Sequence, residues 1–569
     1  MPLPRSLLTA SHQDLDLCLA AGSWPEDIDG ELYVSAPSPD PALRYALFGF
    51  GVLARLSLRP GSHGAPADRF AWRARLLDTP TRRLYEQVPG AFSSGPLGYA
   101  SPLGSPNMVN TAPLPWGDRL FATWDVGRPV ELDPVTLGYL GDVGAIGTWG
   151  GSTFPSTGVL PFVFSSAHPV VDPDRDCLWT VKLVPGRAEP FAWQVVVVRY
   201  DGEGPSVRTW PVRDALVTGS MHTISQTRDW LVLADSGNFK ADPGEMAGGP
   251  RTVTIDDAAA VYLVRKDDLE ATPPGQEVPM RPFTIAPTTG HYYACLDDSD
   301  GVRVLFEHMD LMDLGFHLEP GDLDASGHPV DPALVGMYNM AMGPSSVSEL
   351  CLDPETGTVT ELGRIREDWG WNHQLSAMDW SHEGLEQPTL HHVVFQGFRP
   401  EAVSRRALEA YRDRVDPDRF PGGETPACLV SFRRGGLEVT SRYEFPSLGD
   451  LPSSPSFVPR RPGTAPGHSR MAGTDPGGHD GWVLCPVLSD DGFRVELFDA
   501  ADVGRGPVAT LAAAGGARVP LLLHSAWGLP ARPAPDHERL SFADEAADAL
   551  SELPEPLADA VRAVAAAVG

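Results

Sequence analysis

Four of the sixteen histidines in this chain have sequence surroundings that suit metal ligands. They are His168, His222, His308 and His524, and each lies beside a short apolar run or a tight turn. Consecutive members are 54, 86 and 216 residues apart, so they cannot form a local metal-binding clip. Four neutral nitrogen ligands without cysteine favour iron or another first-row metal over a structural zinc site, because they leave the charge of the ion and open coordination positions available for chemistry.

The third ligand is chosen from a strand pattern. In the run VRVLFEH, alternate residues from Val302 to His308 share one face, so His308 is expected to project from a strand among apolar neighbours. His317, in GFHLEPGD, lacks such a run, and we prefer His308 at this position. His291 lies in a GHYY cluster suited to lining a cavity and is left out of the ligand set, as are His373, His391 and His392.

Short strands are the elements that must position these ligands. Runs rich in Val, Ile, Leu, Trp and Phe alternate with Gly, Pro and Asp turns. A similar phrase ends several runs, at 131–141 (ELDPVTLGYLG), 170–179, 351–363 and 497–511, where an aspartate closes one strand and a turn leads into the next. This texture is typical of repeated β-sheet units. Successive units of a large closed β-fold would then deliver the ligands one at a time toward a common axis.

Helical signal is confined to a few places. The segment 400–415 (PEAVSRRALEAYRDRV) predicts a surface helix inserted between strands. Residues 537–569 predict one or two helices after a Pro-rich stretch, packed on the outside of the β-fold.

Composition sets outer limits on function. The 44 basic and 75 acidic residues give a net charge of −31, which argues against nucleic acid or an anionic membrane as a partner. Six scattered cysteines without CxxC spacing, in a chain that lacks a secretory apolar run, predict reduced core thiols and a cytoplasmic protein. No run of 18 apolar residues predicts a transmembrane helix.

The order of motifs along the chain resembles the carotenoid cleavage oxygenase family, the superfamily of retinal pigment epithelial membrane protein and lignostilbene dioxygenase. The resemblance covers roughly residues 20–530, as in a divergent bacterial-type member. The segments that carry it are SWPEDIDGELYVSAPSPDP at 23–41, NTAPLPWGDRLFATWDVGRPVELDPVTLGYLGDVG at 110–144, AHP at 167–169, MHTISQTRDWLVLAD at 221–235, and the stretch from DGWVLCPVL to VPLLLHSAWGLP at 480–530.

The resemblance implies an all-β fold, a seven-bladed β-propeller with a metal on its central axis, capped by loops and a few helices. It divides the chain into an N-terminal segment (1–22), the propeller (23–530) and a helical C-terminal extension (531–569).

The resemblance also implies one Fe(II) per chain held by the four histidines, with three glutamates hydrogen-bonded to ligand imidazoles. Glu367 in EDWGWN matches one of these glutamates, Asp125 stands in the place of another, and Ser454 replaces the third. Loss of such a partner typically weakens a metal site about 10–100-fold. The stretch 47–56 (LFGFGVLARL) also departs from the family, because it lacks the acidic turn found there.

The activity implied is O₂-dependent cleavage of a carbon–carbon double bond in a carotenoid or apocarotenoid, giving two carbonyl products. Stilbene cleavage and retinoid-type isomerisation on the same iron site remain alternatives, as does a non-catalytic binding module that has lost full iron function. Trp124, where stilbene-cleaving members carry a lysine, tilts against a phenolic stilbene. The expected partner is an apolar small molecule. The segment 154–164 suits either burial, which we favour, or weak peripheral membrane contact. Aromatic residues expected to line the substrate site are Phe154, Phe162, Phe164, Phe239, Trp124, Trp369, Trp371 and Trp527.

Overall fold

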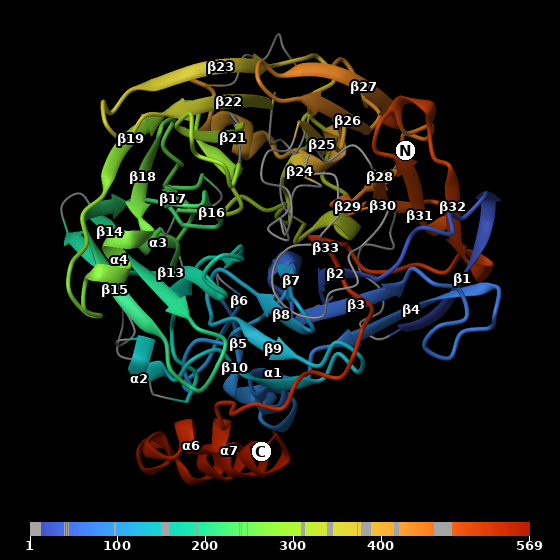
Figure 1. Cartoon of the computed structure of the whole chain (residues 1–569). Helices are drawn as coiled ribbons and strands as arrows, with labels where there is room; N and C mark the ends of the chain where they lie inside the picture. Colours follow the sequence, from blue (N-terminus) through green and yellow to red (C-terminus); the bar gives the residue numbers. More distant parts are fainter. Residues whose placement is uncertain are drawn as a thin grey trace.

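The computed structural model describes residues 13–568 apart from 39, 41–42, 44, 96–97, 150–158, 189–190, 238, 241, 247–248, 309–312, 338–344, 372–373, 377–388, 415–419 and 460–480. These residues form antiparallel sheets that stand around a common centre and follow one another in chain order (Figure 1). In the sheet that starts with β24, that strand lies toward the middle of the ring and β27 lies at its rim (Figure 1). The predicted β-fold built from successive units is therefore present.

Five sheets are each made from strands that are consecutive in the chain. The first two, in chain order, contain β7 (Ala112–Trp116), β8 (Arg119–Thr123), β9 (Val130–Leu132) and β10 (Tyr139–Asp142), then β11 (Phe164–Ser165), β12 (Val170–Asp172), β13 (Cys177–Ala188), β14 (Phe191–Tyr200) and β15 (Arg208–Val217). The next three contain β16 (Ile224–Gln226), β17 (Trp230–Ala234), β18 (Ala259–Arg265) and β19 (Arg281–Ile285), then β20 (Thr289–Ala294), β21 (Val302–His308), β22 (Ser346–Leu352) and β23 (Val359–Ile365), then β24 (Gln374–Ser376), β25 (Leu390–Phe395), β26 (Cys428–Arg433) and β27 (Glu438–Glu444).

A ten-stranded sheet joins the two ends of the ring. Strand β1 pairs on one side with β4 and on the other with β32, so the first described residues lie within this sheet. Residues 13–22, which the expected boundary placed in the N-terminal segment, hydrogen-bond into the β-fold itself as β1. The strands, in sheet order, are β28 (Leu451–Pro452), β30 (Gly481–Ser489), β31 (Gly492–Asp499), β32 (Ala509–Ala513), β1 (Gln13–Gly22), β4 (Arg69–Leu76), β3 (Gly51–Ser57), β2 (Glu31–Pro37) and β33 (Ser525–Gly528), with β29 (Ser456–Pro459) on β30. A separate hairpin is formed by β5 (Ser93–Gly95) and β6 (Gly98–Ala100).

The helices are short, apart from the last one. Instead of one helix over 400–415, a 3₁₀ turn is followed by α5, which begins where the hydroxyl of Ser404 accepts a hydrogen bond from the Arg406 N–H at 3.2 Å. The α-helices are α1 (Pro80–Gln87), α2 (Ile146–Trp149), α3 (Pro243–Met246), α4 (Lys266–Ala271), α5 (Arg405–Ala410), α6 (Phe542–Ala546) and α7 (Glu555–Val568). The 3₁₀ turns are η2 (Ala46–Phe48), η3 (Pro89–Ala91), η4 (Pro332–Leu334), η5 (Pro400–Ala402), η7 (Val503–Arg505), η8 (Ala514–Gly516) and η9 (Asp548–Glu552).

The repeated aspartate phrases are tight turns between paired strands. The carboxylates of Asp133, Asp172 and Asp353 each accept hydrogen bonds from the N–H groups two and three residues later, at 2.7–3.1 Å. The residue four positions after the aspartate has positive φ in all three, +61° at Leu137, +46° at Asp176 and +72° at Gly357. Each aspartate therefore satisfies turn N–H groups that the sheet cannot reach, as its side-chain chemistry predicts.

Both faces of the sheets are covered, which explains the continuous apolar strands. In β14, four consecutive valines, 195–198, are all buried. Val195 and Val197 belong to one apolar cluster, and Val198 on the opposite face belongs to another. Such a strand reads as an unbroken apolar run because neighbouring sheets pack on each side of it.

The C-terminal extension lies on the outside of the ring beside β10 and α1, as predicted (Figure 1). Arg128, which is buried, bonds Asp142 at 2.6 Å and Glu545 of α6 at 2.5 Å. A second group of charges joins Glu131 of β9 to His537 and Arg539, each at 3.0 Å. The extension is thus fixed to the sheet β7–β10 by ion pairs as well as by apolar packing. Among the described residues, no helix is long and apolar enough to cross a membrane.

Candidate metal centre

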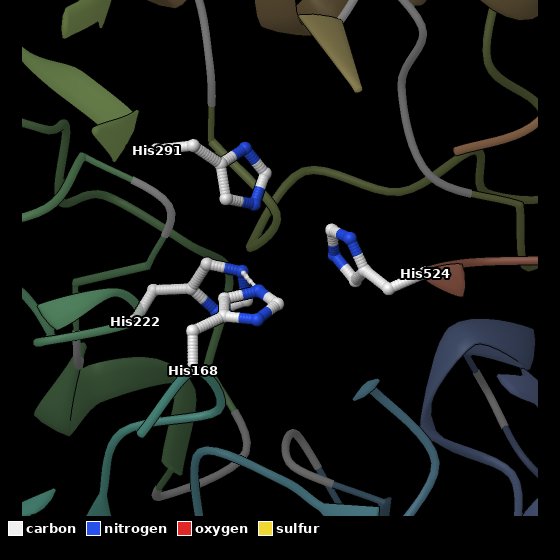
Figure 2. A group of neighbouring side chains, drawn as sticks. All are labelled: His168, His222, His291 and His524. Atoms are coloured by element: carbon white, nitrogen blue, oxygen red, sulfur yellow. Dashed lines mark hydrogen bonds between the residues drawn. The ribbon is translucent and has the colours of Figure 1, made fainter. Parts of the chain in front are cut away.

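Four buried histidines converge on one space. They are His168, His222, His291 and His524, and one ligand nitrogen from each lies within 4.8 Å of those of the other three. Figure 2 shows the four rings facing a common centre. All four are at most 7 % exposed. The cluster therefore contains three of the four predicted ligands, with His291 in the place expected for His308.

Each ligand comes from a different sheet. His168 lies between β11 and β12, His222 lies two residues before β16, His291 is within β20, and His524 directly precedes β33. A parallel bridge between His168 and Thr223 joins the sheet β11–β15 to the sheet β16–β19 at the cluster. Distant segments of the chain therefore bring the four histidines of the cluster together one at a time.

The imidazoles of His168 and His222 are arranged as neighbouring ligands of one ion would be. Nε2 of His168 and Nε2 of His222 are 3.2 Å apart, and the two rings are nearly perpendicular at 87°. Two nitrogens bound to a metal at about 2.1 Å and at right angles would lie roughly 3.0 Å apart. The observed spacing fits a shared ion without movement of the backbone.

Asp125 supports His222 as expected. Both of its carboxylate oxygens lie within hydrogen-bond distance of Nδ1 of His222, at 2.9 and 3.0 Å. A carboxylate on Nδ1 fixes the tautomer that presents Nε2 to the metal. Asp125 lies two residues after the end of β8, and its carbonyl accepts a hydrogen bond from the Ser165 N–H at 2.7 Å, which fixes the backbone from which the shorter aspartate side chain reaches the histidine.

The expectation that His308 completes the cluster is wrong, because it lies on the other face of β21. His308 stacks beside Phe306, bonds Ser348 through Nε2 at 2.5 Å and bonds the carbonyl of Pro287 through Nδ1 at 2.7 Å. The face that carries Val302, Val304 and Phe306 packs against the sheet β16–β19. Burial lowers the pKa of His308 to about 4. The alternation was assigned correctly, but that face leads into a neighbouring sheet and away from the centre.

Sequence reasoning missed His291, which lies opposite Glu307 in the ladder between β20 and β21. Nδ1 of His291 and Oε2 of Glu307 are 3.4 Å apart, and Glu307 is fully buried. Burial raises the pKa of the Glu307 carboxyl well above its usual range. A signal was available in the sequence, because Glu307 is the one charged residue that interrupts the apolar run VLFEH.

Two other expected supporting residues are placed differently. Glu367 lies exposed beyond the end of β23, in a turn closed by the hydrogen bond from the Gly370 N–H to its carbonyl, so it supports no ligand. Within this motif the side chains of Glu367 and Asp368 are exposed, whereas Trp371 is buried. Ser454 is fully buried, and its carbonyl accepts a hydrogen bond at 2.6 Å from the hydroxyl of Ser525, the residue after His524.

The expected lining residues are mostly core packing in the described part of the chain. Trp371 packs on Phe398, and the indole N–H of Trp527 bonds the Asp29 carbonyl at 2.8 Å. Trp124 is buried next to Asp125. The others pack on Trp193 (Phe164), Phe164 (Phe162), Phe395 (Trp369) and Arg251 (Phe239), whereas Phe154 lies outside the described residues. In the described part of 154–164, Val159, Leu160, Val163 and Phe164 are buried, as we favoured.

The residues present fit a first-row metal ion. Nitrogen ligands from four sheets enclose one space, one pair has ligand spacing, and Asp125 fixes one tautomer. The described residues of the cluster include no cysteine. This donor set suits iron, copper, nickel or zinc, and four imidazoles leave positions open for a reactant. Fold and site together define a β-protein with a buried cluster of four histidines that could hold a metal ion.

The chain belongs to the family of retinal pigment epithelial membrane protein, the carotenoid cleavage oxygenases, whose family model matches residues 7–528. It is 29% identical over 170 residues to an apocarotenoid-15,15'-oxygenase of Synechocystis, covering 27% of this chain and 30% of the relative. It is also 29% identical over 157 residues to a chloroplastic carotenoid cleavage dioxygenase 7 of rice, covering 25% of this chain and 26% of the relative. The alignments thus span less than a third of each relative.

Solved structures share the fold over almost the whole chain. A lignostilbene dioxygenase of Pseudomonas brassicacearum superposes with a TM-score of 0.59 at 16% identity, covering 94% of this chain and 100% of that chain. A cobalt-substituted apocarotenoid oxygenase of Synechocystis superposes with a TM-score of 0.58 at 18% identity, covering 92% of this chain and 97% of that chain. At this level of identity the likeness shows the fold alone.

Proposed function

We propose that the protein is a non-haem Fe(II)-dependent dioxygenase that cleaves a carbon–carbon double bond of a carotenoid or apocarotenoid, giving two carbonyl products. The observation that carries the proposal is the convergence of four buried histidines from four sheets in a member of this family. Bound iron would supply the activation of O₂, the co-substrate, that this cleavage requires.

The protein's own part is to hold one ion and to exclude water from it. His168, His222, His291 and His524 would each offer one nitrogen, and Asp125 would keep His222 in the correct tautomer. Their burial removes the cluster from bulk solvent. No side-chain acid, base or nucleophile is needed for this chemistry. The protein therefore contributes the position of the ion and the exclusion of water from it.

An apolar polyene is the substrate class best supported. Both curated relatives carry carotenoid or apocarotenoid in their names. The indole of Trp124, next to Asp125, is buried and lies 6.3 Å from the Phe48 ring. Aromatic surface beside the supporting carboxylate suits an isoprenoid chain better than a phenol.

We further propose a propeller of seven blades with the metal on its axis. Five sheets correspond to one blade each, and the ten-stranded sheet would be two blades joined where β1 pairs with β32. The propeller would then include β1 and end near residue 530, with 531–568 as a separate extension. A cytoplasmic location is proposed from the six cysteines, all of which are free thiols.

The test is the metal content of the chain after reconstitution with Fe(II) and desalting. We expect about one iron in the parent and little in His291→Ala, because the variant loses one ligand of the cluster. His308→Gln is the matched control: it is a buried histidine of the same sheet outside the cluster, and it should retain iron. A parent that retains no iron would favour a non-catalytic binding module or another metal.

Activity then separates the remaining alternatives. Iron-loaded parent, mixed with apocarotenoids under O₂, should give two carbonyl products per substrate, and none without O₂. Turnover that continues without O₂ would indicate an isomerase. Cleavage of stilbenes with no cleavage of apocarotenoids would overturn the proposed substrate class while leaving the metal centre intact.

A further inference from the structure

We propose that Glu307 is a positioning residue for the metal centre: it accepts a hydrogen bond from Nδ1–H of His291 and holds that imidazole with Nε2 toward the ion. The proposal rests on the proposed function, since it gives His291 the role of a ligand. It assigns a carboxylate that the sequence motifs had placed elsewhere, at Glu367.

The backbone brings the two side chains together. His291 of β20 and Glu307 of β21 are direct partners across an antiparallel ladder, so their side chains project from the same face. Oε2 of Glu307 lies 3.4 Å from Nδ1 of His291, just beyond hydrogen-bond length. With Nδ1 turned toward Glu307, the other nitrogen of the ring is the one directed at the remaining histidines (Figure 2). A small rotation of either side chain would close the hydrogen bond.

Among the residues that the structure describes, no structural partner explains the burial of Glu307. It is fully buried, and neither carboxylate oxygen accepts a hydrogen bond from the described residues. The ion pairs of the described residues give it His291 alone. A buried carboxylate without compensation is costly, so such a group is usually paired or serves a metal site. The imidazole of a metal-bound histidine provides that compensation.

Glu349 shows what a structural carboxylate looks like in the same sheet. It lies on β22, is 1 % exposed, and bonds the guanidinium of Arg434 at 3.1 Å and the N–H of Gly435 at 2.5 Å. Glu307 is equally buried but lacks both kinds of partner. Across the cluster, Asp125 already makes the equivalent contact with Nδ1 of His222. Two ligands from adjacent sheets would therefore each be supported by a carboxylate.

The experiment compares Glu307→Gln with Glu349→Gln, which makes the same substitution at an equally buried site. Co(II) is the probe, and its dissociation constant and visible absorption spectrum are measured alongside the thermal midpoint of the metal-free protein. For Glu307→Gln we expect Co(II) affinity to fall about 10–100-fold, with an altered spectrum. Its metal-free midpoint should stay the same or rise, because an uncompensated buried carboxyl is removed. Glu349→Gln should lower the midpoint and leave Co(II) affinity unchanged.

Glu307→Asp completes the design by keeping the carboxylate on a shorter arm. It should bind Co(II) more tightly than Glu307→Gln does, and it provides the comparison with the parent if the glutamine variant does not fold. A parent that binds Co(II) while Glu307→Gln binds it equally well overturns this inference alone. Equal losses of affinity in the Glu307 and Glu349 variants also overturn it, because the effect would then come from the fold. A parent that binds no Co(II) overturns the proposed function and this inference with it.

Discussion

Two groups of buried charges in this protein are built in opposite ways. On the outside of the ring, Arg128 is enclosed between Asp142 and Glu545, and it also bonds the Gly144 carbonyl at 2.6 Å. Burial acts to lower the pKa of Arg128, but the two carboxylates outweigh it and the pKa is raised. At the centre, Glu307 is buried as deeply beside His291, and no lysine or arginine of the described residues forms an ion pair with it.

The difference separates buried charges that stabilise the fold from buried charges that are compensated only when a metal ion binds. A buried ion pair is stable only when its hydrogen-bonding groups are satisfied, as at Arg128. The central group becomes satisfied only when a metal polarises the imidazole. Structural charges should therefore affect stability and leave metal affinity alone, whereas central charges should do the reverse.

The largest effect is expected on the structural side. Arg128→Met leaves Asp142 and Glu545 without their cation, and the loss of one partner of a buried pair costs about 3–5 kcal/mol. The measurement is denaturant unfolding, with hydrogen exchange in α6 and α7 to detect release of the extension. Co(II) affinity should not change.

Arg562→Met is the control for Arg128→Met. Arg562 lies on α7 and pairs with Glu555 and Asp559 at the surface, where its side chain is 49% exposed. Exposed pairs contribute about 0–1 kcal/mol, so this variant should unfold almost as the parent does. Equal effects of the two substitutions would contradict the comparison.

The next largest effect is a pH dependence of the free energy of unfolding, which we expect from His308. Its folded pKa is about 4, below the ordinary 6.5, because burial disfavours the charged ring. Between these values the unfolded chain binds a proton that the folded chain does not, so stability is present above about pH 6.5 and is lost as pH falls toward 4. The expected loss is roughly 3 kcal/mol, since each unit is worth about 1.4 kcal/mol. Unfolding free energies at pH 7 and pH 5 should differ less in His308→Gln than in the parent.

A smaller effect is expected at Asp125. Asp125→Asn removes the charge that Nδ1 of His222 contacts at 2.9 Å while keeping the shape of the side chain. Co(II) affinity should fall about 10–100-fold, as expected for loss of an outer partner. The unfolding midpoint of the metal-free protein should move little, because Asp125 is only partly buried. A large loss of stability with unchanged metal affinity would place Asp125 with the structural charges.

Sequence patterns predicted the β-fold, its aspartate turns and three of the four clustered histidines. The third histidine was missed because alternation assigns residues to faces but does not say which face reaches the centre. His308 and Glu307 are adjacent, and only the packing of β21 between two other sheets decides between them. Glu367 failed for a related reason, since the motif does not say that its own side chain is exposed.

Asp125 could be predicted because the family resemblance implies a carboxylate at this position, although its contact with His222 joins residues 97 apart. Asp125 lies two residues after the end of β8, and its carbonyl accepts a hydrogen bond from the Ser165 N–H, so its position is tied to the segment that leads to His168. The bond of Glu545 to Arg128 could not be predicted, since it joins residues 417 apart across the surface of the molecule. Contacts set by one turn can be derived from sequence, whereas those set by docking of separate segments need the assembled fold.

The smallest effect is expected at Ser454. This residue is uncharged, so it tests whether the central group is supported by charged side chains alone. Its hydroxyl is buried and accepts or donates no hydrogen bond among the described residues, whereas its carbonyl accepts one from Ser525. Ser454→Ala keeps the carbonyl and removes only the hydroxyl, so stability should change by less than about 0.5 kcal/mol. Co(II) affinity should also be unchanged, because the position contributes backbone rather than charge. A tenfold loss of affinity would instead show that the hydroxyl supports His524, and the central group would then have a third supporting side chain.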